Sequence, residues 1–163
     1  MEDNFKSIKI LKTILQLPLH VVHIIALIEK DGKFLAIKKE RILENGKKVV
    51  YYSFPGGLLY HDESPLECIK REVKQEVGIE IEPIRLITFN KYRHPFSGTY
   101  DVSIFVLCKP KSLDIKLGRE VDQRFIEAVW IDENTKDIPE WMREAIIQAK
   151  ENTLSLDFIG KIW

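Results

Sequence analysis

Between residues 20 and 54 of this chain, apolar stretches are separated by short polar segments in a way that predicts a β-sheet. Residues rich in Val, Ile and Leu run from His20 to Lys39 and are interrupted by Asp31-Gly32, which predicts two strands joined by a tight turn. The charged stretch 40–48 predicts a solvated loop around Asn45-Gly46. Strand character resumes from Val49 to Phe54, so we expect the sheet to continue there.

Three segments have the residue spacing of amphipathic helices. Apolar residues within 5–17 recur every three or four positions, and the same periodicity returns over 138–150. Between them, Ser64-Pro65 is typical of a helix N-cap followed by its first residue, and Gly78 is suited to a C-terminal cap. The sequence therefore predicts a central helix over 65–77.

Further strands are predicted at 79–89, 100–109 and 125–131, with polar loops at 90–99 and 110–124. A chain of 163 residues, 45% of them hydrophobic, is long enough to bury one substantial core. We therefore expect a mixed α/β fold in which 1–163 form a single domain.

The charge balance and the cysteines limit the compartment and the partners. Twenty-five basic and 25 acidic residues cancel, which argues against nonspecific attraction to nucleic acid or to an anionic membrane. Cys68 and Cys108 are too few for a disulfide framework and are expected to be two buried thiols. The N-terminal stretch carries acids and lysines, so it resembles neither a signal peptide nor a spanning segment. We expect a soluble cytoplasmic protein.

One motif carries most of the functional information. The sequence from Gly57 onward is GLLYHDESPLECIKREVKQEVGI, in which glycine, glutamate, an Arg-Glu pair, a further glutamate and a second glycine stand at fixed spacings. The matching residues are Gly57, Glu63, Arg71, Glu72, Val73, Glu76, Gly78 and Ile79. Agreement by chance is on the order of one in ten million for each starting point. The segment 57–79 resembles the box of the Nudix hydrolases, the MutT-like family.

Two of these glutamates are spaced so that, within this motif, they indicate metal binding. Glu72 and Glu76 are four residues apart, so they lie one above the other beside the apolar stripe of the predicted helix. Stacked carboxylates repel one another unless a cation lies between them, and such oxygen ligands suit magnesium or manganese. The alternative is a solvated face on which the glutamates pair with Lys70 and Lys74.

The resemblance implies a fold and a reaction. The fold is an α/β/α sandwich with a mixed central sheet flanked by helices. The reaction is hydrolysis of a diphosphate linkage with Mg²⁺ or Mn²⁺ as cofactor, in which the ion activates a water and neutralises phosphate oxygens. Around that ion the resemblance places Glu72, Glu76 and the backbone carbonyl of Gly56.

The resemblance also assigns roles to neighbouring residues. Arg71 is implied to orient a catalytic glutamate and Glu63 to fix the loop, although Arg71 has an alternative partner in Glu67, four residues earlier. Gln75 departs from the family pattern, because it replaces the first glutamate of a Glu-Glu pair and brings no negative charge. We expect one outer metal contact to be lost.

A further acid from outside the box often acts as general base or extra ligand in this family. Glu120 is our candidate here, followed by Asp122 and Glu127, in a charged stretch around the start of the last predicted strand. The alternative is that these side chains are simply solvated.

Substrate recognition is expected in the polar loop after the fourth predicted strand. Tyr92 and Phe96 are suited to stacking on a base, and Arg93 to binding phosphate. The aromatics have the alternative role of packing the loop. Pro95 stands where similar enzymes that cleave ADP-ribose often carry a proline.

These features favour a pyrophosphohydrolase acting on ADP-ribose or a nucleotide sugar. The alternatives are a nucleoside triphosphate pyrophosphohydrolase and a domain that binds or senses nucleotides without catalysis. We expect a small nucleotide substrate, no nucleic acid or membrane partner, and a possible homodimer through the helix at 5–17.

Overall fold

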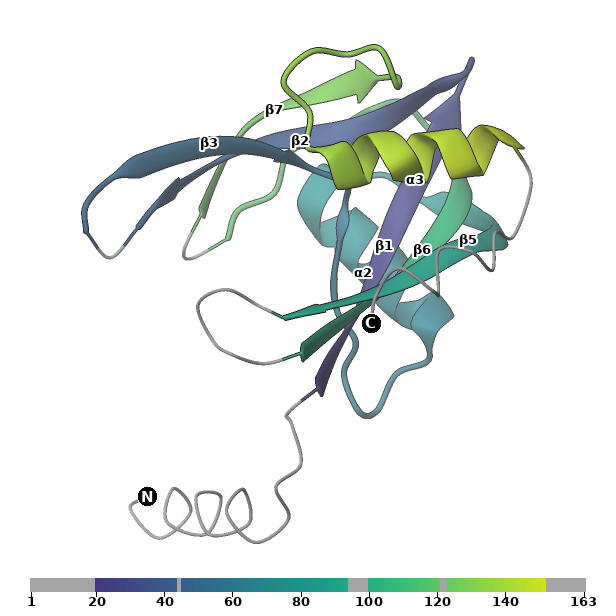
Figure 1. Cartoon of the computed structure of the whole chain (residues 1–163). Helices are drawn as coiled ribbons and strands as arrows, with labels where there is room; N and C mark the ends of the chain where they lie inside the picture. The colour runs from purple at the N-terminus through teal and green to yellow at the C-terminus, as the bar shows by residue number, and fades with distance from the viewer. Residues whose placement is uncertain (1–19, 44, 94–99, 121–122, 152–163) are drawn as a thin grey trace, which may run out of the picture.

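The computed structural model describes residues 20–43, 45–93, 100–120 and 123–151. The predicted segment 5–17 lies outside these residues. Within them, strands and helices follow in the order β1 (His20–Lys30), β2 (Lys33–Ile42), β3 (Lys48–Ser53), β4 (Gly56–Leu58), α2 (Pro65–Val77), β5 (Ile81–Arg93), β6 (Tyr100–Pro110), β7 (Gln123–Ile131) and α3 (Glu140–Glu151). Figure 1 shows their arrangement.

The described strands form a mixed sheet in two parts. Its order is β3-β2-β1-β6-β5, with β4 paired to β1 and β7 paired to β2. Strands β1 and β2 pair only next to their turn, at Glu29↔Phe34 and Lys30↔Lys33, so β4-β1-β6-β5 and β3-β2-β7 separate beyond it. Strands β1 and β6 are parallel, whereas the other pairs are antiparallel.

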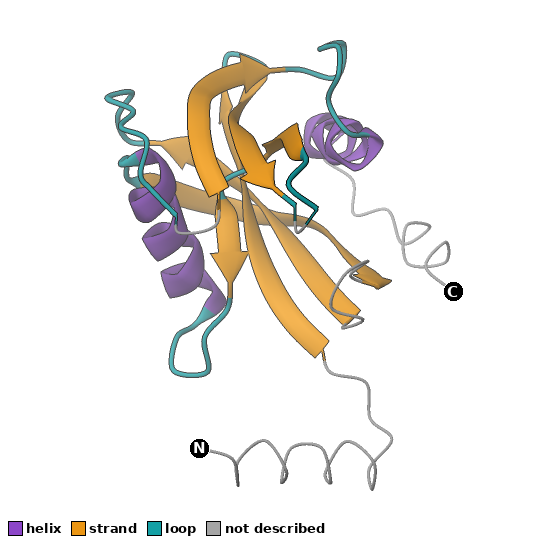
Figure 2. Cartoon of the chain, turned by 90° about the vertical axis from the view of Figure 1, so that its left-hand side faces the viewer, coloured by secondary structure: helices purple, strands orange, loops and turns teal. Residues whose placement is uncertain are grey.

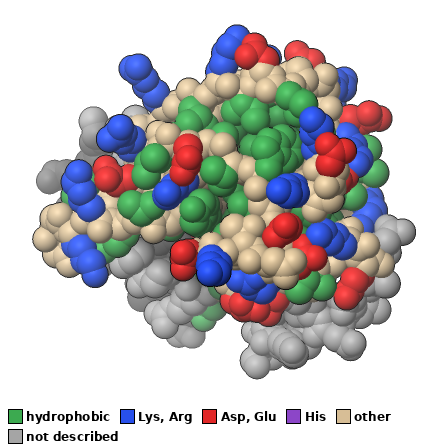
Figure 3. All heavy atoms as spheres, turned by 90° about the horizontal axis from the view of Figure 1, so that it is seen from above, with side chains coloured by type: hydrophobic (Ala, Val, Ile, Leu, Met, Phe, Trp, Pro, Cys, Tyr) green, Lys and Arg blue, Asp and Glu red, His purple; other side chains and the backbone are tan. Residues whose placement is uncertain are grey.

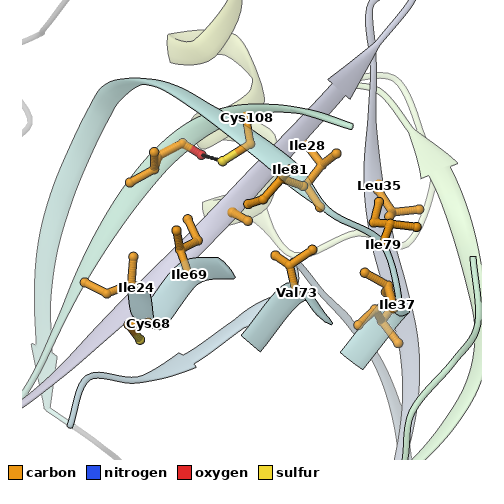
Figure 4. Close-up of a cluster of buried hydrophobic side chains, with 13 residues drawn as sticks. Ile24, Ile28, Leu35, Ile37, Cys68, Ile69, Val73, Ile79, Ile81 and Cys108 are labelled. Carbon is orange, nitrogen blue, oxygen red and sulfur yellow. Dashed lines mark hydrogen bonds between the residues drawn. The ribbon is translucent and has the colours of Figure 1, made fainter. Parts of the chain in front are cut away.

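The two helices cover opposite sides of the sheet, as Figure 2 shows. Helix α2 packs against β1, β4 and β5, whereas α3 packs against β5. Each helix closes its own apolar core. Figure 4 shows the core under α2, whose members include Ile24, Ile28, Leu35, Ile37, Ile69, Val73, Ile79 and Ile81. The core under α3 includes Leu27, Phe34, Ile87, Phe105, Met142 and Ile146. The expected α/β/α sandwich is confirmed.

Helix α2 begins and ends where the sequence predicts. The Ser64 hydroxyl accepts from the Glu67 amide at 3.3 Å, and the Glu67 carboxylate accepts from the Ser64 amide at 2.8 Å, so both halves of a capping box are present. Gly78 caps the other end in the left-handed region, with φ of 74°. This helix is therefore fixed at both ends.

Several predicted boundaries were wrong because tertiary pairing outweighs local composition. Strand β2 continues through the charged residues to Ile42, since β3 and β7 hydrogen-bond to it on both sides. Residues 56–58 form β4 against β1, beyond the strand that was predicted to end at Phe54. Strand β5 extends to Arg93, which places Tyr92 in a strand rather than in a loop. Helix α3 begins at Glu140, two residues later than predicted.

The expected turn and thiols are confirmed. Asp31 and Gly32 both have positive φ, at 51° and 76°, as a two-residue hairpin turn requires. Cys68 and Cys108 are buried and unbonded to one another, and burial raises the pKa of each thiol to about 12. In the described part of the chain, no helix is both long enough and apolar enough to cross a membrane.

Candidate active site

Glu76 is the most deeply buried acid of the box. It projects from α2 with 2% of its surface exposed. Its Oε1 accepts a hydrogen bond from Lys39 Nζ on β2 at 2.6 Å, and its Oε2 accepts from the Gly56 amide at 2.8 Å. Burial raises the pKa of Glu76 to about 7, although Lys39 and the Gly56 amide oppose that shift. This carboxylate thus sits between β2 and the start of β4.

Glu72 lies one turn earlier on α2 and is also buried, with 9% of its surface exposed. Its Oε1 accepts from Arg71 Nη1 at 2.6 Å. A Cβ placed on Gly57 would lie 2.5 Å from both the Cδ and the Oε1 of Glu72. The missing side chain at Gly57 therefore lets β4 approach this carboxylate. Together the two glycines at 56 and 57 bring the β4 backbone against both acids.

Arg71 fastens the loop before α2 to the helix. Its Nε and Nη2 donate to the two carboxylate oxygens of Glu63 at 2.9 and 2.6 Å, and Nη2 also donates to the Leu58 carbonyl at 3.1 Å. This bidentate pair lowers the pKa of Glu63 to about 2. The alternative pairing of Arg71 with Glu67 is wrong, because the Glu67 carboxylate binds Ser64 in the capping box.

The surface alternative for the helical glutamates is also wrong. Glu72 and Glu76 are buried, and Lys74 instead lies 3.9 Å from Glu80. Gln75, which departs from the family pattern, is exposed, and its amide oxygen accepts from Arg71 Nη1 at 3.3 Å. Gln75 therefore supports the guanidinium from the outer side of the helix.

The loop after β6 brings Glu120 toward the same place. The Gly118 amide donates to the Glu76 carbonyl at 2.9 Å, and a Cβ on Gly118 would overlap the Gln75 carbonyl oxygen. Only glycine allows the loop to lie this close to the end of α2. Glu120 follows two residues later, where its charge contributes to the raised pKa of Glu76, and it accepts a hydrogen bond from Gln123.

The other predicted site residues have different contacts where the structure describes them. Glu127 on β7 lies 3.2 Å from Lys38, on the opposite face of β2 from Lys39. Tyr92 is on β5, where burial and the neighbouring Asp101 raise the pKa of its hydroxyl. Arg93 ends that strand. Asp122, Pro95 and Phe96 lie outside the described residues.

A cleft of about 700 Å³ opens beside the cluster. Its lining comprises Glu40, Ile42, Leu117, Gly118, Arg119, Glu120, Gln123, Arg124 and Phe125. Phe125 links the cleft to the buried acids, since Lys39 Nζ lies 4.7 Å from the centre of its ring. The cleft thus offers cationic side chains and an aromatic ring next to carboxylates.

Sequence reasoning missed Lys39, although its pattern contained a signal. Leu35, Ile37 and Lys39 alternate along β2 and therefore share one face of the strand. The first two belong to the buried core under α2, so the third was an inward-facing charge that needed a partner. The strand pattern does not predict which acid pairs with Lys39, because that depends on where α2 lies relative to β2.

The donors near Gly56 fit a magnesium-like ion. No group of three His, Cys, Asp or Glu side chains that would hold a metal exists among the described residues. Mg²⁺ does not require such a cage, because it commonly uses one or two carboxylates and completes its shell with waters and substrate phosphates. Glu72, Glu76 and the adjoining β4 backbone supply that type of donor set.

Comparison with known proteins now decides the family. The model of the NUDIX domain matches residues 18–150. The chain belongs to the NUDIX family. The match includes every described strand and all of α2, so the NUDIX box and the sandwich around it agree.

Individual NUDIX relatives are more distant. A MutT-like protein of Streptomyces ambofaciens is 34% identical over 94 residues, 57% of this chain and 54% of that protein. The 8-oxo-dGDP phosphatase NUDT18 of Danio rerio is 29% identical over 105 residues, 62% of this chain and 31% of that protein. The alignments thus span about half and a third of these relatives.

Solved NUDIX structures support the fold. The MutT protein of Methanosarcina mazei Go1 superposes with a TM-score of 0.66 at 23% identity, covering 83% of this chain and 97% of that one. The arrangement of strands and helices described above is therefore that of the family.

Proposed function

We propose that this NUDIX protein is a metal-dependent hydrolase that cleaves the diphosphate linkage of a nucleoside diphosphate derivative. The observation that carries the proposal is the burial of Glu72 and Glu76 together against Gly56 and Gly57. Burying two acids is costly unless their charges are used or compensated, and the cleft lined by Gly118, Glu120 and Phe125 lies next to Glu76, whose carbonyl accepts from the Gly118 amide.

Different residues of the site have different roles in the proposed reaction. A bound Mg²⁺ or Mn²⁺ ion would supply charge neutralisation of the diphosphate and a water of lowered pKa. Glu72, Glu76 and the Gly56 carbonyl are the groups that would hold it. Arg71 keeps Glu72 in place by its 2.6 Å hydrogen bond. Glu120 stands beside Glu76 at the cleft and is our candidate to accept the proton of the attacking water.

The cleft is suited to a small nucleotide. Arg119 and Arg124 offer charge for phosphate oxygens, and Phe125 offers a face for stacking. Lysine and arginine side chains are interspersed with acids on the described part of the face in Figure 3, so no broad basic surface for a nucleic acid is seen there. The relative from Danio rerio is named for a nucleoside diphosphate. We favour ADP-ribose or a nucleotide sugar as the substrate type, because Pro95 stands where similar enzymes that cleave ADP-ribose often carry a proline.

The test is hydrolysis of a nucleotide panel with Mg²⁺ or Mn²⁺, comprising ADP-ribose, a UDP-sugar, 8-oxo-dGDP and nucleoside triphosphates. Metal-dependent release of a nucleoside monophosphate from ADP-ribose or the UDP-sugar is expected. Glu76→Gln should abolish turnover, whereas Glu80→Gln, which alters an exposed acid paired with Lys74, should not. If only nucleoside triphosphates are hydrolysed, the protein is a nucleoside triphosphate pyrophosphohydrolase instead. Metal-dependent binding in calorimetry without any product would instead indicate a nucleotide-binding domain.

A further inference from the structure

We propose that the ammonium group of Lys39 acts as an internal cation at Glu76 in the metal-free protein and must leave that carboxylate when a metal ion binds. The proposal rests on the metal-binding role of Glu76 in the proposed function. It makes Lys39 a residue that sets the metal affinity of the site from within the fold.

The first support is that both oxygens of the Glu76 carboxylate are already engaged. Oε1 accepts from Lys39 Nζ at 2.6 Å and Oε2 accepts from the Gly56 amide at 2.8 Å. The Gly56 amide belongs to β4, which is held against β1 by the pairing of Ile25 with Gly56. Lys39 instead reaches Glu76 through a flexible four-carbon stem. Lys39 is therefore the contact that is able to give way.

The second support is the charge of the buried cluster. Arg71 is shared between Glu63 and Glu72. Lys39 is paired with Glu76, so three acids and two cations leave the cluster with one formal negative charge. A divalent ion added to it would leave excess positive charge in a buried place, which is unfavourable unless one cation moves away. Arg71 is additionally bound to both oxygens of Glu63, so its release would break more hydrogen bonds than that of Lys39.

The third support is that Lys39 lies against a residue of the cleft wall. Lys39 Nζ lies 4.7 Å from the centre of the Phe125 ring, and Phe125 lines the cleft together with Glu120. A rotation of the stem past this ring would carry the charge from the buried acid to the cleft. Metal binding would thus deliver a positive charge to the side from which an anionic substrate enters.

A neighbouring lysine provides a matched control. Lys38 precedes Lys39 on β2 and forms an ion pair of 3.2 Å with Glu127, also with its ammonium near an aromatic ring, that of Tyr52 at 5.8 Å. It lies on the opposite face of the strand and is more exposed. Lys38→Met therefore removes a comparable ion pair without touching Glu76.

The experiment measures Mn²⁺ affinity from the EPR signal of the free ion at pH 8.5. Lys39→Met keeps an apolar stem beside Phe125 but removes the competing charge, and the dissociation constant should fall roughly tenfold. Lys38→Met should leave it unchanged. An unchanged or weaker affinity in Lys39→Met, or no Mn²⁺ binding by either protein, would overturn the proposal.

A second measurement uses the wild-type chain, so that it does not depend on the folding of a variant. A buried, hydrogen-bonded ammonium exchanges slowly, and ¹⁵N-lysine NMR should detect the Lys39 Nζ protons in the metal-free protein. Addition of Mg²⁺ should remove the Lys39 Nζ signal. If that signal persists after shifts of the α2 amide resonances show that Mg²⁺ has bound, the proposal is contradicted. A spectrum that does not respond to Mg²⁺ at all contradicts it as well. Nucleotide hydrolysis is scored separately. Hydrolysis with unchanged metal affinity rejects only the role of Lys39, and tighter metal binding without hydrolysis rejects only the proposed function.

Discussion

Substitution of Gly57 by alanine should impair the site far more than it impairs the fold. The added Cβ would lie 2.5 Å from the Glu72 carboxylate, whereas ordinary contacts begin near 3.4 Å, so the carboxylate must move by roughly 1 Å. That movement disturbs the 2.6 Å hydrogen bond from Arg71. A displacement of this size in a catalytic group lowers turnover by about 100-fold. The loss of this one charge-assisted, part-buried hydrogen bond costs about 1.5 kcal/mol of stability.

The assay pairs initial hydrolysis rates with urea unfolding, for Gly57→Ala and for a control, Gly32→Ala. Gly32 has φ of 76° but nothing within 4 Å of an added Cβ. Alanine there strains the turn by about 1 kcal/mol and leaves the site alone. The two variants should therefore have similar stability and very different turnover. Wild-type turnover in Gly57→Ala would refute the role given to the position of Glu72.

Three further outcomes follow from the described contacts. Burial raises the pKa of Glu76 from its ordinary 4.5 to about 7, so the metal-free fold retains a proton that the unfolded chain releases. Urea unfolding should show this group's stabilisation, at most about 3 kcal/mol, complete below pH 4.5 and lost by about pH 7, and Glu76→Gln should remove the trend. Gln75→Glu should raise the number of Mn²⁺ ions bound per chain, counted by EPR; an unchanged count would show that this position faces no metal. Ser64→Ala should lower the unfolding free energy by about 1 kcal/mol in the same titration, without changing Mn²⁺ affinity.

Local signals in the sequence were sufficient for α2 and for the acids on it. Ser64 caps the N-terminus of the helix through its side chain, and Gly78 caps the C-terminus through its backbone. Neither cap requires a partner distant in sequence. The four-residue spacing of Glu72 and Glu76 places them together on any helix, and their burial agrees with the predicted position beside the apolar stripe. Such features are predictable because they involve neighbours in the chain.

Features that depend on distant partners were not predictable in the same way. Residues 56–58 form a strand because they pair with an edge of β1. Their own composition does not predict that pairing. The partner of Lys39 is 37 residues away on another element. In the sequence Gly118 is an ordinary loop glycine, and only the structure shows that it packs against the end of α2. Each of these depends on packing between elements, which periodicity along the chain does not encode.

The parallel pairing of β1 with β6 also bears on how the chain is made. His20 pairs with Tyr100 and Ile28 with Cys108, so the first described strand acquires its central neighbour only after most of the chain has been synthesised. Contacts this distant in sequence slow folding and leave apolar strand surface exposed in the meantime. On the ribosome, the hairpin of β1 and β2 would emerge long before β6. Newly made chains should therefore depend more on chaperones than a helical protein of this length does.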